Sequence, residues 1–139
     1  MTSRRFSERG SMSVELVVLT PVLIGCILTI AGGARFVEAE DQVESAASIA
    51  ARAASLEATP ESAAAAGRLA AERALQDRGR SCVDLDVEID TTAFSAGGAV
   101  QTRVTCRTSL EDLAGFGLPG SKTFTASAVA PLEEHRVLP

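Results

Sequence analysis

Residues 16–34 read LVVLTPVLIGCILTIAGGA and contain no charged residue. As an α-helix, these roughly 19 residues would span about 28 Å, close to the hydrocarbon thickness of a bilayer. A chain of 139 residues is too short to bury such a helix on every side. The stretch therefore predicts one transmembrane helix rather than the core helix of a soluble protein.

A cleaved secretory signal is the alternative, because Arg4, Arg5 and Arg9 precede the run and the small residues 31–33 could follow a cut. The run is longer than the apolar core of a typical signal, roughly 7–15 residues, which favours the membrane helix. Arginine excess marks the cytoplasmic flank, and only Arg35 follows the run closely. We therefore expect a single-pass protein of the cell membrane, with the N-terminus cytoplasmic and the C-terminal domain extracytoplasmic.

Charge and cysteine content narrow the possible partners. The net charge of −5 and the lack of a basic stripe argue against nucleic acid. Cys82 and Cys106 fall in the exported part, where a disulfide is favoured over free thiols. Cys26 lies inside the span and is expected to be a small buried packing residue. No CxxC pair is present and His135 is the single histidine, so no metal site is expected.

Two helices are predicted. Residues 35–58 contain neither proline nor glycine, and no stop signal separates them from the span, so one long helix is expected over about residues 11–58, with its transmembrane part at about 14–35. Thr59, Pro60 and Glu61 start a second helix that runs to about Arg78. The long helix carries one small-residue face, formed by Val43, Ala46, Ala47, Ala50, Ala51 and Ala54.

The pattern then changes to a period of two in three runs, residues 83–90, 99–110 and 122–130. The first two are separated by a glycine-containing loop and predict a hairpin. The apolar face is expected to comprise Val83, Leu85, Val87 and Ile89 in the first run, Val100, Thr102, Val104, Cys106, Thr108 and Leu110 in the second, and Phe124, Ala126, Ala128 and Ala130 in the third.

The predicted fold class is α+β: a long N-terminal helix, a shorter helix, and a three-stranded antiparallel sheet packed on the helices. The extracytoplasmic domain is expected over residues 59–131, with a loop or one helical turn at 111–120 and a frayed tail over 132–139. Aligning the apolar faces places Val83 near Cys106, which leaves Cys82 one residue out of register for a disulfide.

Residues 10–21, GSMSVELVVLTP, carry the functional signal. A glycine follows a short basic leader, and Glu15 lies five residues beyond it at the start of the apolar helix. A charged residue within a membrane helix is a functional hypothesis by default, because its burial in lipid is costly. The alternative is that Glu15 lies at the interface and is solvated by headgroups.

These residues resemble the type IV pilin-like family, and more closely the TadE-like pseudopilins of the tight-adherence systems. The resemblance rests on Gly10, Ser11, Val14-Glu15, Pro21 and the alanine-rich ASIAARAA of residues 47–54. It covers residues 9–57 and is only architectural afterwards. The fibre-forming Flp pilins are shorter and have Glu-Tyr where this chain has Glu15-Leu16, so the resemblance implies a minor subunit.

The resemblance implies that residues 1–10 are a leader, which a prepilin peptidase removes by cutting between Gly10 and Ser11. The new amine at Ser11 and the Glu15 carboxylate would lie about one helical turn apart. Pairing of one subunit's glutamate with a neighbour's amine would offset the cost of each charge in lipid. Other pilin-like subunits, the pilus assembly platform and the membrane are the expected partners.

Three positions of the span suggest helix packing. Gly25, Thr29 and Gly33 recur every fourth residue, which would let another helix approach closely, although small residues can also recur by chance.

The sequence contains no phosphate-binding loop, nucleophile elbow or histidine cluster, so neither an enzyme nor a cofactor is expected. The leading hypothesis is a minor pseudopilin that acts in assembly of a tight-adherence pilus or a related secretion machine. The alternative is a single-span membrane anchor that presents a small extracytoplasmic binding domain.

Overall fold

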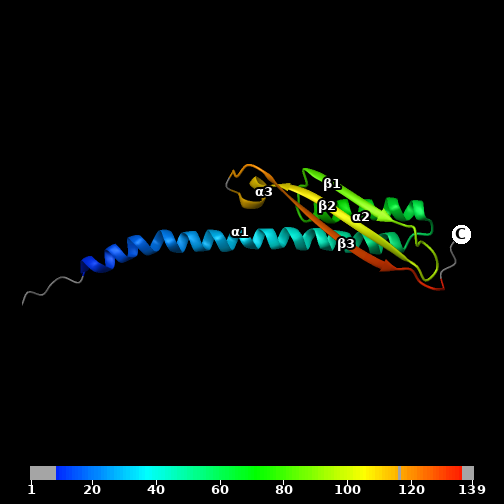
Figure 1. The fold of residues 1–139 in the computed structure, drawn as a ribbon, viewed down its shortest axis with the longest axis horizontal. Coiled ribbons are helices and arrows are strands. Elements are labelled where there is room, and N and C mark those ends of the chain that lie inside the picture. The colour runs from blue at the N-terminus through cyan, green and yellow to red at the C-terminus, as the bar shows by residue number, and fades with distance from the viewer. Residues whose placement is uncertain (1–8, 116, 136–139) are drawn as a thin grey trace, which may run out of the picture. The chain divides into compact units, whose positions relative to one another are not determined.

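The computed structural model describes residues 9–115 and 117–135, and these residues fold into three helices and three strands. Figure 1 shows their arrangement. Two compact units are distinguished, Met1–Ala34 and Arg35–Pro139, and the first contributes only the beginning of α1. The predicted α+β class is confirmed. The elements are α1 (Arg9–Ser55), α2 (Pro60–Asp77), β1 (Asp84–Asp90), β2 (Ala99–Ser109), α3 (Leu110–Ala114) and β3 (Ser121–Pro131).

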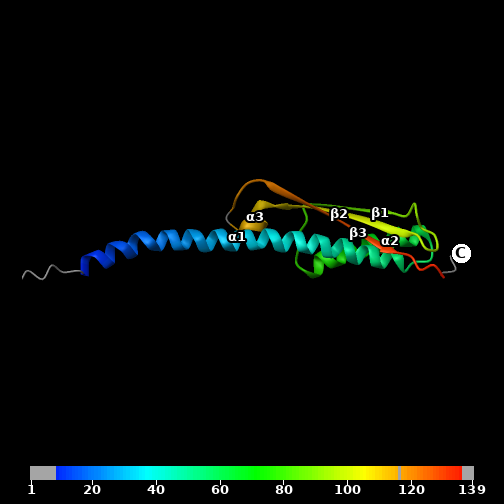
Figure 2. The same cartoon turned by 60° about the horizontal axis from the view of Figure 1, so that its bottom comes forward.

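The small-residue face of α1 forms one wall of the core in the second unit. The predicted face is fully buried, with no residue more than 1% exposed. Figures 1 and 2 both show α2 running beside the C-terminal part of α1, with the sheet covering the two helices. A buried hydrogen bond ties sheet to helix, since Thr102 Oγ1 donates to the Ala47 carbonyl oxygen over 2.8 Å.

Gly67 on α2 lies where α2 approaches both β1 and α1 closely. A Cβ placed there would stand 2.8 Å from Cδ1 of Ile89 and 3.3 Å from the Ala50 carbonyl oxygen. Both distances are shorter than ordinary contacts, so the glycine lets α2 lie against β1 and α1 at once.

Local signals set the ends of α2 as predicted. Thr59 caps the N-terminus: its hydroxyl accepts a hydrogen bond from the Ser62 N–H over 3.2 Å, and the Ser62 side chain bonds back to the Thr59 backbone. Proline at the first position sacrifices no helical hydrogen bond. The helix ends at Asp77, and Gly79 then takes the left-handed conformation with φ +67°.

The sheet has the order β1-β2-β3, and both pairs are antiparallel. Its register places Leu85 opposite Cys106 and Cys106 opposite Phe124, so the alternating apolar residues form rows on the helix-facing side. The opposite face is polar and exposed. It carries two ion pairs, Arg103–Glu88 at 3.6 Å and Arg107–Asp84 at 3.9 Å, which contribute little to stability because water screens them.

Three positions differ from the predicted pattern. Val83 is 63% exposed, because β1 begins only at Asp84 and the preceding backbone turns its side chain outward. Leu110 belongs to α3, because Ser109 caps that helix and ends the strand. Leu132 is not frayed: its N–H donates to the Gly98 carbonyl oxygen over 2.8 Å, and its side chain is 4% exposed in a second small core.

The loop between β1 and β2 is held by its own hydrogen bonds. The Asp90 Oδ1 atom accepts from the Thr92 N–H over 2.9 Å. The backbone and side chain of Thr92 stabilise the carboxylate and lower the pKa of Asp90. At Gly98 any Cβ would collide with the Ala93 carbonyl oxygen, so this turn requires glycine.

Candidate functional site

The beginning of α1 exposes its large apolar side chains. No residue between Val14 and Ala31 is buried, and Val17 and Ile30 are each 73% exposed. Within the described residues, one helix, α1 from Val14 onward, is both long enough and apolar enough to cross a membrane, judged by length and composition. Apolar side chains on every side of a helix need lipid or partner helices around them. This surface is therefore the first candidate site.

The predicted processing residues lie at the start of α1. The backbone of Gly10 and Ser11 is helical, because α1 begins at Arg9, two residues earlier than predicted. Most of the predicted leader, residues 1–8, lies outside the described residues. Cleavage between Gly10 and Ser11 therefore stays a prediction.

Glu15 lies on the exposed surface of α1, one turn beyond Ser11. It forms no hydrogen bond or ion pair with any residue that the structure describes. Glu15 lines a shallow, open recess together with Val14, Val18 and Leu19, whose side chains are apolar. An ionised carboxylate in such surroundings needs water, a headgroup or a cation from another molecule.

The stripe formed by Gly25, Thr29 and Gly33 is also open. A Cβ added at Gly25 or Gly33 would meet nothing within 4 Å. The Thr29 hydroxyl donates to the Gly25 carbonyl oxygen over 2.8 Å, so this polar group is satisfied inside its own helix. The prediction that Cys26 is buried is wrong for this structure: the cysteine is free and exposed, because no other element covers this part of α1 within the described residues. The stripe leaves room for another helix, and its packing role stays a prediction.

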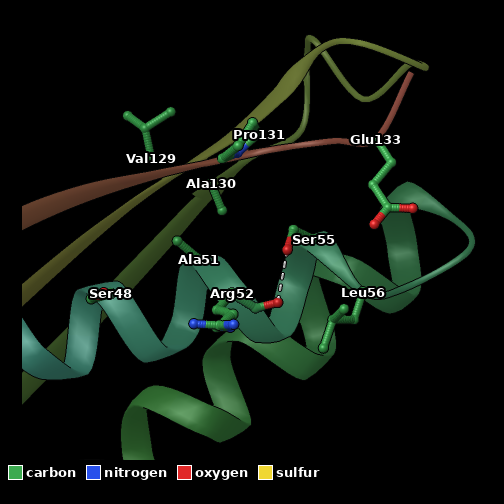
Figure 3. A pocket seen from close by; sticks show the side chains of 9 residues that line it. All are labelled: Ser48, Ala51, Arg52, Ser55, Leu56, Val129, Ala130, Pro131 and Glu133. Atoms are coloured by element: carbon green, nitrogen blue, oxygen red, sulfur yellow. Dashed lines mark hydrogen bonds between the residues drawn. The ribbon is translucent and has the colours of Figure 1, made fainter. Parts of the chain in front are cut away.

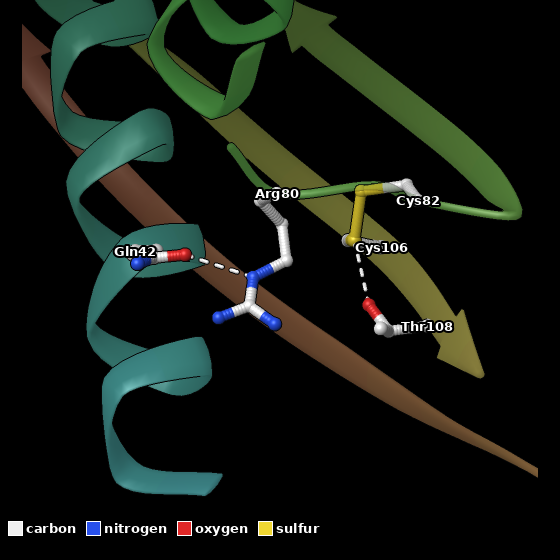
Figure 4. Close-up of a disulfide and its surroundings, with 5 residues drawn as sticks. All are labelled: Gln42, Arg80, Cys82, Cys106 and Thr108. Atoms are coloured by element: carbon white, nitrogen blue, oxygen red, sulfur yellow. Dashed lines mark hydrogen bonds between the residues drawn. A yellow bond between two sulfur atoms is a disulfide. The ribbon is translucent and has the colours of Figure 1, made fainter. Parts of the chain in front are cut away.

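A disulfide joins Cys82 to Cys106, with 5.4 Å between their Cα atoms (Figure 4). The sequence placed Cys82 one residue out of register for this bond, and the backbone turn that exposes Val83 removes the mismatch. Because β1 starts at Asp84, Cys82 precedes the strand and its half-buried side chain can point into the core. Cys106 is fully buried in β2, and its sulfur lies 3.5 Å from the Thr108 hydroxyl.

A groove of about 490 Å³ lies between the end of α1 and strand β3 (Figure 3). Its charged lining residues are Arg52 and Glu133, and Val129 at its rim is 61% exposed. A binding domain, the alternative function, would present this groove to a ligand.

Comparison with known proteins singles out the beginning of the chain. Residues 10–52 match the family model of TadE-like proteins. This segment is TadE-like. The match includes Gly10, Glu15, the apolar run and residues 47–52 of the alanine-rich stretch, on which the resemblance rests. No curated protein and no solved structure matches the chain.

The match and the exposed helix together indicate a membrane protein related to the tight-adherence pilus. The candidate transmembrane helix fits a single-pass protein. The match ends at Arg52, three residues before α1 ends, so α2 and the sheet lie outside it.

Proposed function

We propose that this chain is a minor pseudopilin: a structural, non-catalytic subunit that acts in assembly of a tight-adherence pilus or a related secretion machine. The observation that carries the proposal is the TadE-like match over residues 10–52, which spans Gly10 and Glu15 on a helix with an exposed apolar surface. In the proposed orientation the N-terminus is cytoplasmic and the disulfide-containing unit is extracytoplasmic, where oxidation is permitted.

Processing by a prepilin peptidase would prepare the helix for assembly. A cut between Gly10 and Ser11 would remove three arginines, which hold the N-terminus on the cytoplasmic side. It would also create an amine about 6 Å along the helix axis from Glu15, at 1.5 Å rise per residue. The processed end would then carry one positive and one negative group at the edge of the membrane.

The two groups would act between subunits. Glu15 has no partner among the described residues, and its carboxylate is costly to bury alone in lipid. A neighbouring subunit's amine would neutralise it, while the open stripe at Gly25, Thr29 and Gly33 would allow the two helices to approach closely. The exposed apolar side chains would thus contact lipid before assembly and the helices of neighbouring pilin-like subunits after it.

Processing is tested by the intact mass of protein purified from its native membrane. We expect a mature chain that begins at Ser11, and we expect Gly10→Leu to accumulate as the precursor. Gly32→Leu is the matched control, because it makes the same change in the same helix away from the cut and should still be processed. An uncut wild-type chain, or one that begins near Ala34, would refute processing at this site.

Assembly is tested separately with Glu15→Gln, which keeps the size and polarity of the side chain but removes its charge. We expect this variant to insert and to be cut, yet to lose cross-links to other pilin-like subunits in membranes. Glu44→Gln, an exposed position on the same helix, should cross-link like the wild type. Normal cross-linking of Glu15→Gln would leave Glu15 as an interfacial residue and remove the pairing step.

A further inference from the structure

A polar cavity of about 290 Å³ lies in the second unit, between α1, the turn after α2 and α3. Arginines from separate parts of the chain converge on it, and the sequence gives no motif for this arrangement. The lining residues are Arg35, Glu38, Gln42, Arg78, Gly79, Arg80, Asp112 and Leu113.

Arg80 is held in place by a buried amide. Its Nε donates to Oε1 of Gln42 over 2.8 Å, and Gln42 is only 8% exposed (Figure 4). The other end of this amide donates to Oε1 of Glu38 over 3.2 Å. Hydrogen bonds at both the oxygen and the nitrogen of the Gln42 amide thus orient it, and the amide holds the Arg80 guanidinium through Nε. No hydrogen bond within the described residues uses the two terminal nitrogens of Arg80, so their donors can bind another molecule.

In the part of the chain that the structure describes, the other two arginines also have N–H donors without an acceptor. Arg78 uses Nη2 to donate to the Ser45 hydroxyl over 2.9 Å. Arg35 extends toward the turn after α3, where its Nη1 lies 3.9 Å from the Cβ position built at Gly115. Among the described residues none of the three forms an ion pair, whereas Arg103 and Arg107 on the sheet both do.

The two acids on the cavity wall are partly engaged. Glu38 accepts from Gln42, and Oδ2 of Asp112 accepts from the Ser109 hydroxyl over 2.7 Å. With three guanidinium groups against two carboxylates, the lining keeps an excess of one positive charge. Guanidinium donors in a planar fork match the oxygens of a phosphate, so the cavity has the chemistry of a phosphate site.

The chain itself suggests the source of the phosphate. Arg35 is the first charged residue after the uncharged stretch 16–34, and that stretch is just long enough to cross the hydrocarbon layer. Where such a stretch ends, the phosphates of phospholipid headgroups begin. We propose that Arg35, Arg78 and Arg80 bind the phosphate of a phospholipid in the leaflet where the span ends, so that the second unit is anchored to the membrane surface.

This proposal needs α1 to span a membrane but does not need processing or pilus assembly. Full-length protein in detergent would be titrated with phosphatidylethanolamine or phosphatidylglycerol, and the lipids retained would be counted by native mass spectrometry. Arg35→Gln/Arg78→Gln/Arg80→Gln should weaken lipid retention about tenfold or more, because charged hydrogen bonds are lost. Arg52→Gln/Arg68→Gln/Arg73→Gln is the matched control: it removes the same charge from exposed helical positions, and its retention should stay near wild type.

Two further measurements keep the test decisive. If the triple variant does not fold, Arg35→Gln alone replaces it, since Arg35 makes no hydrogen bond within the described residues, and a severalfold loss is expected. Inorganic phosphate separates the two sources of the ligand: at equal concentration it should displace little of a short-chain phospholipid. Equal retention by the cavity and control variants, or displacement of the lipid by inorganic phosphate, would overturn the proposal.

Discussion

Reducing the disulfide between Cys82 and Cys106 should remove a large part of the stability of the second unit. The bond joins residues 24 apart, and a closed loop of about that length corresponds to about 12 cal/mol/K of unfolded-chain entropy, or about 3.5 kcal/mol at 25 °C. Because Cys106 is fully buried and can keep its packing as a free thiol, the loss should come mainly from the unfolded chain.

Amide hydrogen exchange of the full-length protein in detergent measures this loss directly. A loss of about 3.5 kcal/mol corresponds to about 300-fold faster exchange of the slowest amides, which we expect in β2. A Cys26→Ser background leaves only the paired cysteines to react. In this background, the amides of the Cys82→Ala variant should exchange as fast as those of the reduced protein, and adding reductant should not change their rates. Identical exchange of β2 with and without the bond would refute the reasoning.

Three substitutions test the packing of the second unit by the same exchange measurement. Thr59→Ala removes the cap of α2 and should cost about 1 kcal/mol, with faster exchange concentrated in its first turn. Gly67→Ala should lower the stability by about 1 kcal/mol, because crowding against Ile89 and Ala50 outweighs the better helix propensity of alanine. Adding Ile89→Val should restore part of the lost stability. A Gly67→Ala variant that is more stable than the wild type would contradict the predicted crowding. Thr102→Val keeps the shape but loses the hydrogen bond to α1, at about 1 kcal/mol. Thr123→Val, at an exposed position of β3, should change little, and equal effects of the two substitutions would count against the hydrogen bond.

Periodicity predicted most of the architecture, because it records which side of each element is buried. The alanine-rich face of α1 and the alternating rows of β2 and β3 could be read directly from residue spacing. The start of β1 could not, since Val83 continues the alternation yet lies outside the strand. A turn of the backbone before Asp84 exchanges the directions of Val83 and Cys82, and apolar spacing alone does not encode that turn.

The candidate sites also differ in whether the sequence alone could predict them. Gly10 and Glu15 were found because they lie close together in the sequence and interrupt a simple pattern. The arginine cavity was missed because its members come from separate elements: Arg80 contacts Gln42 across 38 positions of the chain. Only the packing of α2 beside α1 brings them together, and an arginine in a loop has no sequence signal that distinguishes it from a solvated one.

The composition of α1 explains why its two parts behave differently. The first part exposes large side chains such as Leu23 and Ile24, which bring much apolar area to lipid or to another helix. The second part buries mostly alanine, which loses no rotamer freedom and lets α2 and the sheet approach closely, but contributes little burial energy per residue. A small unit with such a core has little hydrophobic stability in reserve. The stability of its folded state must therefore depend strongly on the Cys82–Cys106 bond.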